Sequence, residues 1–168
     1  AIPTDCATES DASPVVYYVV FNESTLNADV IMLKVDKKLN VTGQVDVKSN
    51  LTAYNEYDAK NLHAACASND VHAFCWKYGN DKAKFAMYHS DGTHIKKAKN
   101  APQNKEISDI IYDANSNIFR YFYKEYVYDG QMDNERFFST NFNPNGTVNQ
   151  VKQVYYLTKG ECDGRYLG

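Results

Sequence analysis

Residues 83–98 read AKFAMYHSDGTHIKKA, two short segments on either side of the tetrapeptide Ser90-Asp91-Gly92-Thr93. An Asp-Gly step between two such segments is a strong signal for a tight hairpin turn. Short segments that are separated by a turn signal are typical of strands. These residues therefore predict a β-hairpin made of the strands Ala83–His89 and His94–Ala98.

The rest of the chain repeats this plan on both sides of the hairpin. Further strands are predicted over residues 15–21, 29–35, 41–47, 71–78, 107–112, 118–128, 136–142 and 148–157. Polar turns over residues 35–38, 89–92 and 143–146 occupy similar places in three successive units, each of which contains a long aromatic strand. Such a pattern is typical either of a divergent internal repeat or of any long β-meander.

The composition and the length predict one all-β domain over residues 1–168. The chain has 14 Tyr and 8 Phe, residues that favour pleated, half-buried surfaces, and 168 residues fit a single domain. Long antiparallel strands must hide their edges, and closure into a barrel does so best. We therefore expect an antiparallel meander closed into a barrel, with a β-trefoil of three repeats and a small propeller as alternatives.

In size and strand plan the chain resembles a lipocalin or a related calyx barrel, although the G-x-W motif near the first strand is absent. The resemblance rests on size, strand plan and expected secretion rather than on a motif. The four cysteines point to the same compartment, because an even number spread along a chain without C-x-x-C is typical of two disulfides. They are Cys6, Cys66, Cys75 and Cys162. Three pairings are possible; Cys66–Cys75 is favoured because both residues flank the turn-like segment 68–70.

Four N-x-S/T sequons support secretion, since each begins beside a predicted turn or strand end, where a glycan acceptor is exposed. Their acceptors are Asn22, Asn40, Asn50 and Asn145. The start of the sequence, Ala1-Ile2-Pro3, is interpreted as the N-terminus left by removal of a signal peptide. We therefore expect an extracellular glycoprotein.

Several functional classes find no support in the sequence. The net charge of −3 does not favour nucleic acid, and no run of ~18 apolar residues is present to span a membrane. No catalytic constellation, phosphate-binding glycine loop or cofactor motif is present. A metal site at His89, Asp91 and His94 would lack ligands, so surface histidines beside a turn are the better interpretation.

The aromatic strands carry the functional prediction. Aromatic residues lie on both faces of the strand at 118–128 and on one face of the strand at 71–78, and tyrosine offers both an apolar surface and a hydroxyl group. We therefore predict a carrier that binds a small apolar or amphipathic ligand in an aromatic-lined pocket. Its predicted lining is Phe74, Trp76, Phe85, Tyr121, Tyr123 and Phe138. The alternatives are a carbohydrate-binding lectin and a secreted effector or inhibitor that binds another protein.

Overall fold

The computed structural model describes residues 2–52, 61–77, 83–100, 106–128 and 133–158, and these residues form antiparallel β-structure without a helix. The first sheet contains β1 (Ile2–Thr8), β2 (Pro14–Asn22), β3 (Asn27–Val35) and β4 (Val41–Thr52). The second sheet contains β5 (Leu62–Cys66), β6 (Val71–Lys77), β7 (Ala83–His89) and β8 (His94–Asn100). The third sheet contains β9 (Glu106–Asp113), β10 (Ile118–Tyr128), β11 (Asp133–Phe142) and β12 (Val148–Thr158).

The predicted all-β class is therefore confirmed, and the described strands form three similar units. Each unit is a four-stranded meander in which consecutive strands pair. In the described part of the chain we find no helix with the length and hydropathy that crossing a bilayer requires.

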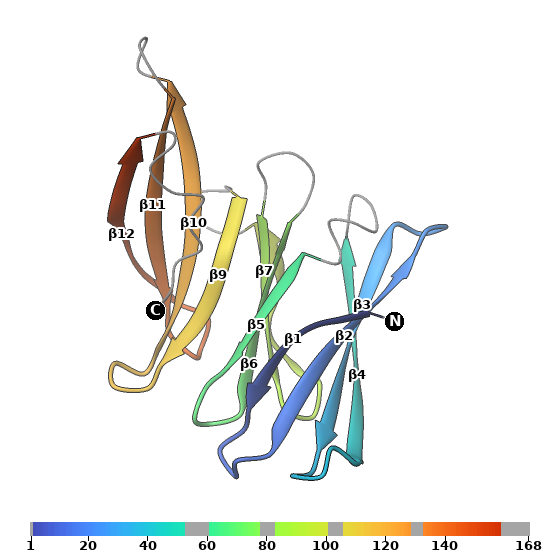
Figure 1. Ribbon diagram of the computed structural model, residues 1–168. Coiled ribbons are helices and arrows are strands. Elements are labelled where there is room, and N and C mark those ends of the chain that lie inside the picture. The colour runs from blue at the N-terminus through green and yellow to red at the C-terminus, as the bar shows by residue number, and fades with distance from the viewer. Residues whose placement is uncertain (1, 53–60, 78–82, 101–105, 129–132, 159–168) are drawn as a thin grey trace.

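A closed barrel is not found among the described strands. Pairing runs through β1 to β4, stops, begins again at β5, and stops once more between β8 and β9. A barrel wall would need hydrogen bonds across those two breaks. Instead the three sheets lie side by side as layers (Figure 1), and β5 contacts both β1 and β9.

The layered arrangement explains why aromatic residues occur on both faces of the second sheet. One face, which includes Phe74 and Trp76, packs against Tyr17 and Met32 of the first sheet. The opposite face, which includes Phe85, packs against the third sheet. A sheet covered on both sides needs apolar residues at every position, so two-sided aromatic character reflects two packed interfaces.

A five-residue turn recurs at one end of the three sheets. Its first residue donates its backbone N–H to the fifth residue and accepts from the N–H of the fourth. The fourth residue has a positive φ, which is 85° at Gly92 and 83° at Gly146, values that glycine adopts without strain. The described turns of this type span residues 9–13, 36–40, 67–71, 89–93 and 143–147. Because the same turn occurs in each sheet, residues can be matched between sheets by their position relative to it.

The favoured Cys66–Cys75 pairing is wrong. Cys66 lies opposite His72 in the β5–β6 ladder and Cys75 lies opposite His63. Because side chains alternate along a strand, this register places the two sulfurs on opposite faces of the second sheet. Cys6, Cys66 and Cys75 are free thiols, and Cys162 lies outside the described residues.

Candidate functional site

The six aromatic residues predicted to bind a ligand do not gather around one pocket. Phe74 and Trp76 belong to the packed layer between the first and second sheets. The other four belong to the layer between the second and third sheets, namely Phe85, Tyr121, Tyr123 and, partly buried at its edge, Phe138. The middle sheet separates the two groups.

Within these layers the aromatic rings contact one another. Phe85 stacks on Phe142 with ring centroids 4.1 Å apart, and Tyr123 stacks on Phe138 at 5.2 Å. Phe74 meets the edge of Tyr17 at 5.3 Å. These are the distances and tilts of packed aromatic cores. Ligand binding by the six residues remains a prediction, and the geometry draws attention to two other places.

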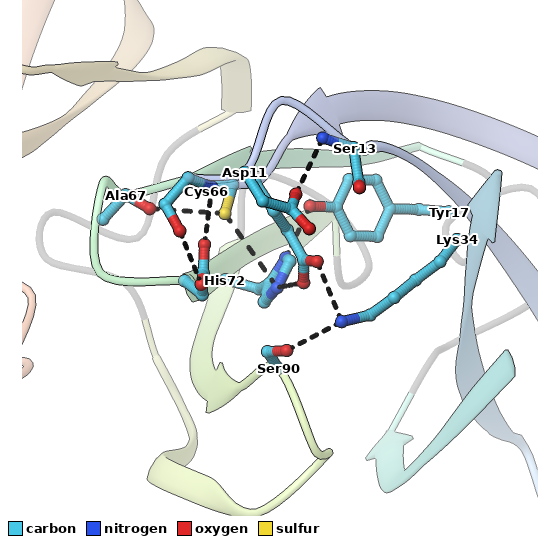
Figure 2. Close-up of polar contacts among 11 residues, drawn as sticks. Asp11, Ser13, Tyr17, Lys34, Cys66, Ala67, His72 and Ser90 are labelled. Carbon is cyan, nitrogen blue, oxygen red and sulfur yellow. Dashed lines mark hydrogen bonds and ion pairs between the residues drawn. The ribbon is translucent and has the colours of Figure 1, made fainter. Parts of the chain in front are cut away.

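The first place is a buried polar network between the first and second sheets (Figure 2). The Glu9 carboxylate accepts from His72 Nε2 at 3.1 Å and pairs with Lys34 Nζ at 2.8 Å. Lys34 Nζ also donates to Ser90 Oγ at 2.9 Å. The side chains of His72 and Glu9 are 0% and 5% exposed, whereas that of Lys34 is 27% exposed. The network therefore joins the first two sheets through the buried carboxylate of Glu9.

The partners of His72 define its protonation. Nδ1 lies 2.7 Å from the Tyr17 hydroxyl, so the neutral ring with its proton on Nε2 satisfies both contacts: Tyr17 donates to Nδ1, and Nε2–H donates to Glu9. Burial lowers the pKa of His72, and the Glu9 carboxylate partly opposes that shift. Burial likewise raises the pKa of the Tyr17 hydroxyl. The network is therefore complete with a neutral imidazole.

Cys66 lies beside this imidazole, but the arrangement does not activate it. Its Sγ is 3.9 Å from His72 Nε2, the nitrogen that Glu9 already engages. A nucleophilic pair needs one ring nitrogen for the thiol and the other for the orienting acid. Burial, with Asp70 and Glu9 nearby, raises the pKa of Cys66 to about 12, so the thiol stays protonated at neutral pH. No cluster suited to a metal ion is found in the described part of the chain.

The equivalent positions one sheet further along carry different residues. Glu9 and Ala67 are each the first residue of the recurring turn. Lys34 and Met87 each lie two residues before such a turn and pair with equivalent residues, Val15 and Ala73. The interface between the second and third sheets thus has Ala67 and Met87 where the preceding interface has an ion pair.

The second place, an open pocket of about 540 Å³, lies between the turn ends of the second and third sheets. Each sheet contributes four residues to its lining. They are Asn69, Val71, His89 and Ile95 from the second sheet, and Asn117, Asn143, Pro144 and Asn145 from the third. The lining thus combines four amides with three aliphatic side chains and one imidazole, and it contains no carboxylate, ammonium or guanidinium group.

Hydrogen bonds between turns hold the two walls of this pocket in place. The Tyr112 hydroxyl donates to Asn117 Oδ1 at 2.8 Å and lies 3.0 Å from Ser68 Oγ, the residue before Asn69. Asn145 Oδ1 accepts from the backbone N–H of Thr147 at 2.9 Å and from its hydroxyl at 2.7 Å. The pocket is therefore built from ordered turns.

Sequence reasoning missed this pocket. Its residues come from four separate turns and strand ends, and nothing in the sequence places 69, 117 and 143 together. A signal was present in the turns themselves, because asparagine recurs there at positions that face a neighbouring sheet. Asn145 was identified as a glycan acceptor, and His89 as a surface histidine beside a turn; both line the pocket.

The remaining predicted acceptors lie away from it. Asn22 is exposed at the β2–β3 turn, at the other end of the first sheet, and Asn40 is exposed in the turn before β4. Asn50 lies within β4, and its side chain is outside the described part.

Comparison with known proteins adds no identification. No protein-family model matches the chain, and no curated protein matches its sequence significantly. The functional argument therefore depends on the geometry of the molecule itself.

Proposed function

We propose that this protein is a carbohydrate-binding protein that takes a neutral saccharide into the pocket between its second and third sheets. The observation that carries the proposal is the lining: amides at residues 69, 117, 143 and 145 converge with Val71, Ile95 and Pro144. An amide side chain both donates and accepts hydrogen bonds. That pairing suits neighbouring sugar hydroxyls, which also do both.

The absence of charge in the lining narrows the ligand class. Phosphates and carboxylates are bound by arginine, lysine or helix N-termini, and amines by carboxylates; the lining has none of these. An apolar carrier pocket would be lined mainly by hydrophobic and aromatic side chains, whereas half of this lining is amide. The aliphatic residues provide a surface for the C–H groups of a sugar ring.

The size and the construction of the pocket fit the same ligand class. A volume of about 540 Å³ lies within the range of small-molecule sites. The Ser68–Tyr112–Asn117 contacts fix the turns before a ligand arrives. Preorganised polar groups reduce the entropy cost of binding.

We also propose how the three sheets are arranged. Three four-stranded meanders, with β5 between β1 and β9, follow the strand plan of a small β-propeller, in which each blade is one such sheet. We take the sheets as three consecutive blades. The pocket then lies between two blades, and the secretion that the sequence predicts would bring the protein to extracellular glycans.

A glycan array of neutral and acidic oligosaccharides tests the proposal, followed by calorimetric titration of the best neutral binder. Asn69→Ala should weaken that binding by about tenfold, the value of one lost hydrogen bond. Asn115→Ala is the matched control, because Asn115 is exposed in the β9–β10 turn and does not line the pocket.

If neither neutral nor acidic glycans bind the unglycosylated protein, the lectin proposal is wrong. Titration of a fatty acid with Trp76 fluorescence as the readout then tests the carrier that the sequence suggested. If acidic glycans alone bind, the argument from the uncharged lining is wrong.

A further inference from the structure

One residue of the pocket, Asn145, is also the acceptor of a sequon. The segment Asn145-Gly146-Thr147 carries the N-x-T pattern, and Asn145 is an exposed residue of the lining. Among the acceptors whose side chains the structure describes, Asn145 alone lines that pocket. A glycan attached here would begin inside the proposed ligand site.

The conformation of Asn145 leaves its nitrogen available. Thr147 holds Oδ1 through its backbone N–H and its hydroxyl, and Nδ2 has no partner among the described residues. Asn40 differs, since its Nδ2 donates to Asp36 Oδ2 at 2.9 Å, and a sugar on that nitrogen would disturb the contact. The turn itself keeps Asn145 in place, because Gly146 donates its N–H to the Asn143 carbonyl at 2.8 Å.

We infer that N-glycosylation of Asn145 closes the saccharide pocket, so that the glycosylated protein does not bind the ligand that the unmodified protein binds. This inference rests on the proposed function. The modification joins C1 of the first sugar to Nδ2 and breaks the bond between C1 and the diphosphate of a lipid-linked oligosaccharide donor. One proton leaves Nδ2, and the lipid diphosphate is released.

The physical reason is occupancy. A pocket of about 540 Å³ has room for a small ligand only. A sugar attached to its lining stays at an effective concentration that no free saccharide matches. Its core also stands between the lining of the third sheet and solvent, so a free saccharide loses both space and amide partners.

The test uses protein from a glycosylating eukaryotic host and two changes at Thr147, which does not line the pocket. Thr147→Val removes the sequon and keeps the branched shape; it loses the hydroxyl bond to Asn145 Oδ1 but keeps the backbone N–H that also donates to that oxygen. Thr147→Ser keeps the sequon and the hydroxyl. Occupancy at Asn145 is measured by glycopeptide mass spectrometry, and saccharide binding by the same calorimetric titration.

Thr147→Val should bind the neutral saccharide at least tenfold more tightly than the Thr147→Ser and unchanged proteins, both glycosylated at Asn145. Ser24→Ala, which removes the sequon at Asn22 on the opposite end of the first sheet, should leave binding unchanged. Equal binding by the glycosylated protein and Thr147→Val would overturn the inference while leaving the lectin proposal intact. Lack of glycan at Asn145 would also overturn it. No binding by any form, Thr147→Val included, would reject both.

Discussion

The Glu9 network gives the sharpest test of how the first two sheets are held together. In Glu9→Ala, His72 Nε2–H loses its acceptor in a fully buried position, and Lys34 loses its counter-charge. An unsatisfied buried donor costs about 1–3 kcal/mol. The lost pair adds less than the 3–5 kcal/mol typical of fully buried pairs, because Lys34 is 27% exposed and retains Ser90. We expect Glu9→Ala to lower the free energy of unfolding by about 2–4 kcal/mol.

The chain itself supplies the compensating change, because the next interface has Ala67 and Met87 at the equivalent positions. Lys34→Met alone leaves the buried Glu9 carboxylate without its cation and should cost at least as much as Glu9→Ala. The double variant Glu9→Ala/Lys34→Met contains no unpaired charge. Its free energy of unfolding should therefore exceed that of either single variant by about 1 kcal/mol or more.

Urea unfolding followed by Trp76 fluorescence measures all three variants, since Trp76 lies in the layer between these sheets. Strict additivity of the two single losses in the double variant would refute the reasoning. It would mean that Glu9 and Lys34 do not act on each other.

Three further predictions concern titration, packing and the pocket. Because burial lowers the pKa of His72 below its ordinary value of 6.5, the unfolded chain binds its proton first on acidification; stability should fall as the pH drops below about 6.5. Urea midpoints across pH should show a weaker fall in His72→Gln, and an unchanged one in the exposed-site control His94→Gln. Thr140 Oγ1 is buried without a partner in the described structure, so Thr140→Val should leave thermal stability unchanged or raise it by about 1 kcal/mol; a loss of that size would show that the hydroxyl is paired. Tyr112→Phe removes the hydroxyl that holds Asn117, and should weaken saccharide binding several-fold in calorimetry with a stability change below about 1.5 kcal/mol; unchanged affinity would show that this bond does not order the pocket.

Most strands could be predicted from the sequence because alternation and turn chemistry are local. The strands Ala83–His89 and Ile118–Tyr128 were predicted with the bounds that the structure shows. The strands β1 and β5 were missed. Pro3 and Asp5 break the apolar pattern of β1, and β5 has only five residues, LHAAC, two of them alanine. Such short segments gain their strand conformation from neighbouring sheets.

The assembly of the strands could not be predicted from local pattern. Aromatic residues on both faces fit a lined cavity and a sheet covered on both sides equally well. What decides between them is whether β4 pairs with β5, and such a pairing depends on long-range packing rather than on either strand's own residues. The same limit applied to Cys66 and Cys75: their separation fits a hairpin, but a difference of one position in register decides which face each sulfur occupies.

The asparagines that line the pocket could serve their turns rather than a ligand, because asparagine is also favoured in turns. Two of its amides have a backbone reason to be there: Asn117 adopts φ of 52°, which asparagine tolerates, and Asn145 Oδ1 caps the N–H of Thr147. Either could be kept for the turn without any ligand. Asn69 is different. It lines the pocket and is exposed, and it makes no hydrogen bond within the described residues. The positive φ of its turn falls on the next residue, Asp70. Because Asn69 makes no side-chain hydrogen bond that holds its turn, the effect of Asn69→Ala on saccharide binding distinguishes a ligand site from a set of ordered turns.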